Sequence, residues 1–271
     1  MAENPQPAAR TLGAAAVAVL TTANALDKAA ASRATAQAWW QGRLAHGFDM
    51  APPARPARPD RPKRLPPNKM PTRGRGSRAG RIALLHAVAH IELNAIDLAW
   101  DMVARFGDRM PRGFVDDWVR VGDDEARHFR MLQGRLESLD AAYGDLPAHD
   151  GLWEASMATA DDLLGRLAVV PMVLEARGLD VTPGMIDRFA TQGDHDSAAV
   201  LRVIYEDEIG HVAAGQRWFS RLCARRGLDR QQLFQEMVGR YFRGSLKPPF
   251  NTDARAEAGV LPDWYAPLAM S

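Results

Sequence analysis

Cysteine is almost absent from this chain of 271 residues, and one residue, Cys223, excludes an intramolecular disulfide and any cysteine-built zinc or iron–sulfur site. The chain also lacks a run of about 18 uncharged apolar residues, so no membrane-spanning helix is expected. Charge of one sign is not in excess, because 34 Lys and Arg stand against 33 Asp and Glu. An Ala-rich run at residues 12–20 imitates a secretory signal, but the helical pattern continues past Lys28, which favours the cytoplasm.

Proline and positive charge are concentrated in residues 51–81, the Pro/Arg strap. This segment holds eight Pro, eight Arg, two Lys and one Asp, a net charge of +9 that leaves about −8 for the rest of the chain. So much proline predicts an extended chain rather than a helix. The strap could lie across an acidic helical body, or its arginines could anchor nucleic-acid phosphates. It has no interleaved aromatic residues for base stacking, so we favour the first interpretation.

After the strap the pattern is helical and predicts an all-α fold. The four long helices that we expect are residues 83–106, 112–139, 155–177 and 197–226, and a glycine follows three of them as a C-terminal stop. A short helix is expected at residues 185–192. A long crossover between helices two and three is typical of a ferritin-like four-helix bundle. We therefore divide the chain into a helical segment (1–50), the strap (51–81), the bundle (82–226) and a C-terminal tail packing on it (227–271).

Two Glu-x-x-His motifs carry the chemistry. Glu125 and His128 lie in the second predicted helix, and Glu208 and His211 lie in the fourth. Residues three apart share one face of a helix, so each pair can present a carboxylate and an imidazole to one point. One such pair is weak evidence, but two pairs within apolar stretches indicate a metal site.

The other two helices supply matching carboxylates. Glu92 lies 33 residues before Glu125, and Glu175 lies 33 residues before Glu208, so the chain carries the same helical hairpin twice. Four carboxylates and two imidazoles are the donor set of a dinuclear iron or manganese site in such bundles. The predicted metal ligands are Glu92, Glu125, His128, Glu175, Glu208 and His211.

Residues around these ligands suggest further roles. A ligating histidine usually donates its second N–H to a carboxylate, so we expect bonds from His128 to Asp207 and from His211 to Asp124. Tyr205, one turn before Glu208, is a candidate redox-active or hydrogen-bonding residue near the metals, although a packed core tyrosine is the stronger alternative.

Pro171 is expected to kink the third helix beside Glu175. His86 and His90 lie on a different face from Glu92, and we interpret them as structural residues or as residues that support the ligands.

The segments around the ligands resemble a bacterial ferritin-like family catalogued as a domain of unknown function. They read LHAVAHIEL at 85–93, DEARHF at 124–129, LEARGLD at 174–180 and DEIGHV at 207–212. More distantly, the chain is similar to the di-iron tRNA hydroxylase, to rubrerythrins and to the radical subunit of ribonucleotide reductase. These resemblances imply activation of O₂ or peroxide at two irons, with manganese as an alternative, and do not identify the substrate.

Three functions stay open on this basis. The leading one is an O₂-activating hydroxylase or oxidase that needs an electron donor and acts on a small organic molecule or a modified tRNA base. The second is peroxide or oxygen detoxification of the rubrerythrin type, although the single cysteine excludes the cysteine-ligated iron domain that those proteins commonly add. The third is iron or manganese binding without turnover.

Overall fold

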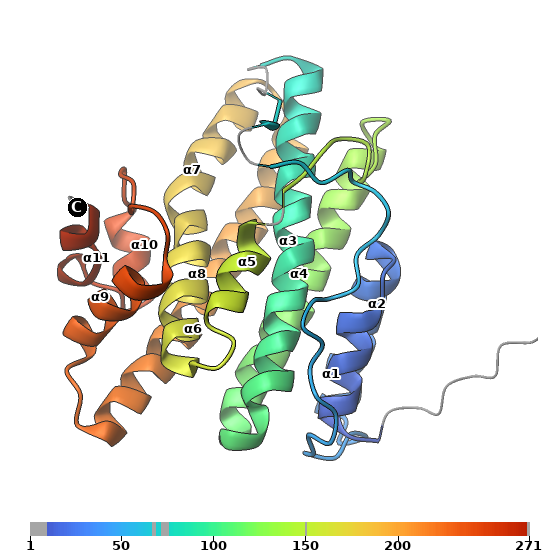
Figure 1. Ribbon diagram of the computed structural model, residues 1–271. Helices are drawn as coiled ribbons and strands as arrows, with labels where there is room; N and C mark the ends of the chain where they lie inside the picture. The colour runs from blue at the N-terminus through green and yellow to red at the C-terminus, as the bar shows by residue number, and fades with distance from the viewer. Residues whose placement is uncertain (1–9, 67–68, 72–75, 150, 270–271) are drawn as a thin grey trace, which may run out of the picture. The chain divides into compact units, whose positions relative to one another are not determined.

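The computed structural model describes residues 10–66, 69–71, 76–149 and 151–269, and these residues form an all-α fold without a strand (Figure 1). The predicted all-α class is therefore confirmed. The described chain divides into two compact units. Unit one contains residues 10–60 and 92–130, and unit two contains residues 61–91 and 131–269, apart from the gaps.

Unit one combines an N-terminal helix pair with parts of two long helices. The pair is α1 (Leu12–Thr21) and α2 (Ala25–Trp40), which lie side by side, and the long helices are α3 (Arg78–Phe106) and α4 (Arg112–Glu137). Asn24 separates α1 from α2 because its side chain caps the amides of Leu26 and Asp27. The described part of the helical segment that the sequence predicts at residues 1–50 thus contains two helices.

A buried ion group fastens the strap inside unit one. Asp97 of α3 is fully buried and pairs with Lys28 of α2 and with Arg58 of the strap, whose Nη1 lies 2.6 Å from Asp97 Oδ2. Arg58 also donates to Asn94 Oδ1 at 2.6 Å. Burial lowers the pKa of Lys28 and raises the pKa of Asp97, and the attraction between the partners opposes both shifts. The described part of the strap at Arg58 is therefore a packed structural element.

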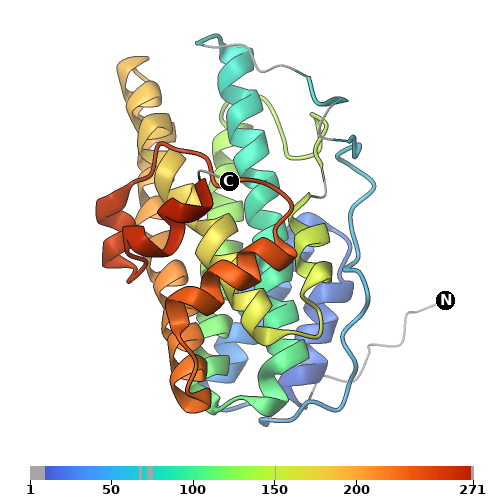
Figure 2. The ribbon, with the colours of Figure 1, turned by 60° about the vertical axis from the view of Figure 1, so that its left-hand side comes forward.

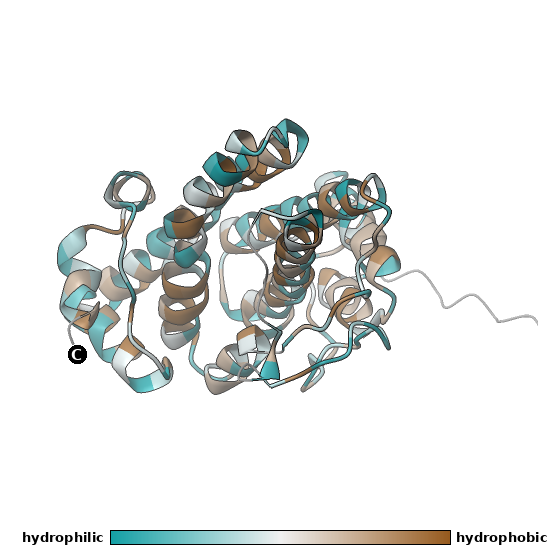
Figure 3. Ribbon diagram, turned by 90° about the horizontal axis from the view of Figure 1, so that it is seen from above, coloured by the Kyte–Doolittle hydropathy of each residue, from teal (hydrophilic) through white to brown (hydrophobic). Residues whose placement is uncertain are grey.

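Unit two holds the remaining helices (Figures 1 and 2). They are α5 (Gly151–Ala158), α6 (Leu163–Val169), the π-helical turn η3 (Val170–Glu175), α7 (Ala176–Thr191), α8 (His195–Arg226), α9 (Arg230–Tyr241), α10 (Thr252–Glu257) and α11 (Pro262–Ala269). The helices α7 and α8 lie side by side, and α9 packs on α6, α8 and α11. Many helices show a hydrophilic and a hydrophobic side (Figure 3), as expected of helices that bury one face.

The third predicted helix, residues 155–177, is wrong in its bounds. Its first residues belong to α5, and a non-helical turn at Thr159–Asp162 separates them from the rest. After that turn the helix continues through Gly178 to Thr191. The predicted stop at Gly178 and the separate helix at 185–192 do not exist. Pro183 should deprive the Leu179 carbonyl of its helical N–H, but Asn251 Nδ2 donates to that carbonyl at 3.1 Å. A side chain 72 positions along the chain thus satisfies the carbonyl that Pro183 would leave open.

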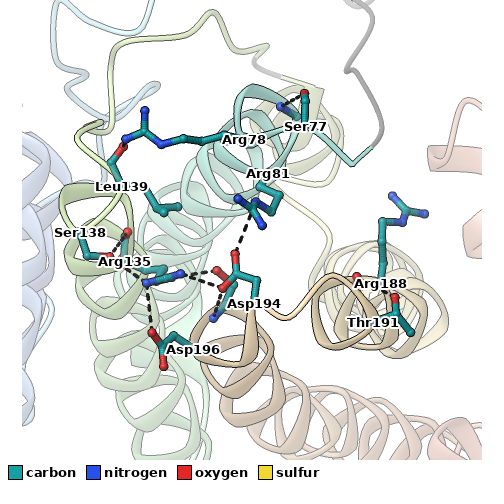
Figure 4. Close-up of polar contacts among 12 residues, drawn as sticks. Ser77, Arg78, Arg81, Arg135, Ser138, Leu139, Arg188, Thr191, Asp194 and Asp196 are labelled. Carbon is teal, nitrogen blue, oxygen red and sulfur yellow. Dashed lines mark hydrogen bonds and ion pairs between the residues drawn. The ribbon is translucent and has the colours of Figure 1, made fainter.

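Asp194 holds the start of α8 in unit two (Figure 4). Its Oδ1 accepts from the Ser197 amide at 3.1 Å as the helix N-cap and from Arg135 Nη2 at 2.7 Å, and Arg81 Nε lies 3.8 Å from Oδ2. Burial opposes ionisation, but the bonds from Ser197 and Arg135 outweigh it and lower the pKa of Asp194. The carboxylate therefore stabilises the folded state in its charged form.

We expect Asp194→Ala to lower the free energy of unfolding by about 1–3 kcal/mol, because the cap and the charged hydrogen bonds are lost together. Since its folded pKa is depressed, this contribution is present above the unfolded pKa and is lost as pH falls through the folded pKa. Urea unfolding at neutral and acid pH measures both effects. The control is Asp196→Ala, whose carboxylate is 83% exposed and 3.4 Å from Arg135. An equal loss in both variants at neutral pH would contradict the assignment.

The helix α3 with its following turn, residues 78–109, is long and apolar enough to cross a membrane by length and composition. It is the one such helix in the described ranges, and 72% of its most apolar 18-residue window is buried inside the protein. This burial is typical of a core helix in a soluble protein.

Candidate metal site

Unit one brings three of the predicted ligands together. Glu92 projects from α3, and Glu125 and His128 project from one face of α4, with His128 Nδ1 at 3.2 Å from Glu92 Oε2 and 3.4 Å from Glu125 Oε2. Ligand atoms of all three lie within 4.8 Å of one another. Glu125 and His128 are fully buried, and Glu92 is 3% exposed. This group is the core of the candidate metal site.

The electrostatics of this group favour a cation. Burial raises the pKa of Glu92 well above its usual value, repulsion from Glu125 raises it further, and the hydrogen bond with His128 opposes both effects. Two carboxylates this close together repel each other, and their burial adds the cost of removing them from water. A divalent ion would remove that cost, and two carboxylates with one imidazole are donors that iron and manganese accept. The residues therefore fit a metal ion.

Unit two carries the second set of predicted ligands. In α8, Glu208 and His211 are one helical turn apart and both buried, with His211 Nδ1 at 3.7 Å from Glu208 Oε2. Glu175 is the last residue of η3. The predicted Glu-x-x-His geometry is thus present in both α4 and α8, as the i, i+3 spacing requires.

A π-helical turn positions Glu175. Pro171 lies in this turn, at the place where the sequence predicts a kink, and such turns are frequent at functional sites. Gly215 of α8 allows the close approach, because a Cβ there would lie 2.4 Å from Pro171 Cγ. The sequence analysis missed Gly215, which carries no side chain to signal its role.

The predicted neighbours of the ligands have other contacts within their own units. Asp124 accepts from Arg127 at 3.0 Å in α4. The Tyr205 hydroxyl accepts from Asn251 Nδ2 at 2.9 Å. The bonds from His128 to Asp207 and from His211 to Asp124, and the role of Tyr205 near the metals, stay predictions.

His86 and His90 hold the segment of unit two between α4 and α5, which fits the structural alternative of their assignment. His86 Nε2 accepts from the Gly144 amide at 2.9 Å, and His90 lies 2.8 Å from the Tyr143 hydroxyl and 3.0 Å from the His149 carbonyl. Both imidazoles also stack on the Tyr143 ring. The sequence analysis gave Tyr143 no role, because nothing in its spacing indicates this contact.

Comparison with known proteins places the chain in a family. Residues 21–266 match the family described as a protein of unknown function (DUF455). An uncharacterized protein of Haemophilus influenzae is 44% identical over 199 residues, which cover 71% of this chain and 69% of that protein. No solved structure matches the chain significantly.

Proposed function

We propose that this chain, which belongs to the DUF455 family of proteins of unknown function, is a di-iron or iron/manganese carboxylate enzyme that activates O₂. The reaction would be a hydroxylation or oxidation of a small organic molecule or a modified tRNA base, with electrons from a separate donor. The single observation that supports this proposal most is the buried group of Glu92, Glu125 and His128. We expect the protein to act in the cytoplasm.

The repeated hairpin motif supports two metal ions rather than one. Glu92, Glu125 and His128 would provide three ligands, and Glu175, Glu208 and His211 would provide three more in the same order along the chain. Two ferrous ions would supply the redox chemistry that side chains of this protein lack.

The residues of the chain would set the conditions for that chemistry. The carboxylates of Glu92 and Glu125 would balance the charge of the ions, and the helical spacing of Glu125 and His128 would hold both donors at one point. The complete burial of this pair excludes bulk water. Tyr205, with its hydroxyl bonded to Asn251, would be held in a single orientation beside the second set of ligands in the sequence.

The test is the metal content of the full chain expressed with iron, combined with absorption spectra after anaerobic reduction and addition of O₂. About two irons per chain and a new visible band after O₂ would support the proposal. Tight metal with no reaction toward O₂ or peroxide would favour metal binding without turnover, and faster consumption of peroxide than of O₂ would favour detoxification. Absence of bound iron and manganese would overturn both the site and the function.

A further inference from the structure

A cavity of about 440 Å³ lies in unit two between η3, the start of α7 and the segment that leads from α9 to α10. Its walls include Val173 and Leu174, which directly precede Glu175, and Phe242 and Phe250 from the C-terminal segment. This volume is in the range of small-molecule sites, which are typically about 300–1,000 Å³. No part of the metal site described above lines it.

Positive charge exceeds negative charge around this cavity. Arg177, Lys247 and Arg255 line it together with one acid, Asp180. Asp180 already accepts from Arg255 Nη2 at 2.7 Å, from Arg255 Nε at 2.8 Å and from the Asn251 amide at 3.0 Å, and its Oδ2 also lies 3.4 Å from Arg177 Nη1, so one carboxylate is shared by two guanidinium groups. The cavity therefore has cationic groups that Asp180 does not balance.

Two of these cations are fixed in place. Arg177 Nη1 donates to the Lys247 carbonyl at 2.6 Å and to the Pro249 carbonyl at 3.3 Å, so one end of its guanidinium is held while its side chain stays 41% exposed. Arg255 is 2% exposed and packs over the Tyr265 ring at 4.6 Å. Its Nη1 is buried and has no hydrogen-bond partner among the described residues. An unpaired buried donor on a charged group is costly, so an anion that reached it would bind favourably.

The rest of the wall is apolar. Val173 and Leu246 are buried, and Leu174, Phe242 and Phe250 are half-buried. A cavity with apolar walls and a few converging charged groups recognises ligands that combine both characters. The apolar part would displace water from the side chains, and the arginines would orient the charged end.

We propose that this cavity binds an organic anion in which a carboxylate or phosphate group is attached to an apolar body. Arg177 and Lys247 contact the charged group, Arg255 Nη1 supplies a further donor, and Phe242 and Phe250 cover the apolar body. This site goes beyond the proposed metal chemistry, since binding requires no metal ion. It also gives a route by which a ligand would touch the residues that lead into Glu175.

The experiment is calorimetric titration of the full-length protein with octanoate, octyl phosphate and octanol. We expect at least one of the two anions to bind with a submillimolar dissociation constant and octanol to bind about tenfold more weakly, as the loss of one charged hydrogen bond predicts. The two anions distinguish a carboxylate ligand from a phosphate ligand. Failure of both to bind at 10 mM, or equal binding of octanol, would overturn the proposal.

Variants locate the binding to this cavity. Arg177→Gln and Lys247→Gln should each weaken the anion about fivefold to tenfold. Lys247→Gln guards against a folding defect, because no hydrogen bond of the Lys247 side chain holds the described fold. The matched control is Arg188→Gln, an exposed arginine of the same helix that does not line the cavity, and it should bind as the unaltered protein does. Unchanged binding in both cavity variants would contradict the assignment.

A titration on protein freed of metal by a chelator separates this proposal from the metal proposal. The anion should bind with the same affinity within about threefold, because the cavity and the ligand group of unit one share no residue. Loss of binding after chelation would overturn the claim that the site is independent of metal. Absence of metal in a protein that still binds the anion would contradict only the proposed function.

Discussion

Replacing Glu125 with glutamine is expected to move the stability of the metal-free and metal-loaded protein in opposite directions. The metal-free protein should gain free energy of unfolding, on the order of 1 kcal/mol, because the buried charge beside Glu92 is removed. The metal-loaded protein should lose about 2.7 kcal/mol or more if the metal is present at a hundred times its dissociation constant. A merely structural carboxylate would destabilise both forms when replaced.

Urea unfolding with a chelator and with Mn²⁺ under otherwise equal conditions measures both effects, and metal analysis of the same samples measures the ion content. The matched control is Glu206→Gln, an exposed glutamate two residues before Glu208 in α8 that should leave both unfolding curves and the metal content unchanged. If Glu125→Gln lowered the stability of the metal-free form and left metal content unchanged, the group would be a hydrogen-bonded core network.

The i, i+3 geometry of the two Glu-x-x-His motifs could be predicted from sequence because it is local. An i, i+3 pair faces one point in any regular helix, so Glu125 with His128 and Glu208 with His211 needed only the correct assignment of α4 and α8. Glu92 followed from the equal spacing of the two hairpins, and the structure places it 3.2 Å from His128. Sequence spacing alone determines these contacts, whereas the role of the residues as metal ligands stays a prediction.

The errors arise where a distant residue changes a local rule. Gly178 and Pro183 are strong helix-ending signals, yet α7 runs through both, and Asn251 bonds the Leu179 carbonyl that Pro183 would leave open. Likewise the cavity beside η3 joins Val173 of the bundle sequence to Phe250 near the C-terminus. Neither contact has a periodicity that a sequence can display, since each depends on tertiary packing of residues more than 70 positions apart.

Breaking the buried ion group of unit one is expected to have the largest effect on stability. Asp97→Ala should lower the free energy of unfolding by about 3–5 kcal/mol, because Lys28 is left without its partner in a buried place. Burial lowers the pKa of Lys28 and raises the pKa of Asp97, so it disfavours the charged form of each residue. The charge of the partner offsets this effect, and removing one partner leaves the other charge buried without that compensation. Urea unfolding of the variant and the unaltered protein at pH 7 measures the difference.

Two further variants separate charge from volume and locate the effect on the strap. Asp97→Asn keeps the volume and should retain most of the loss, whereas Asp60→Asn, at an exposed strap residue, should cost less than about 0.5 kcal/mol. Since Arg58 joins the strap to Asp97, a protease of broad specificity such as proteinase K should cleave near Arg58 faster in both Asp97 variants. Stability within about 0.5 kcal/mol of the unaltered protein and equal cleavage would show that the ion group does not hold the strap. That result would favour the second interpretation of the strap, in which exposed residues such as Arg61 and Lys63 contact nucleic-acid phosphates. A loosely held cationic segment is free to follow a nucleic-acid backbone.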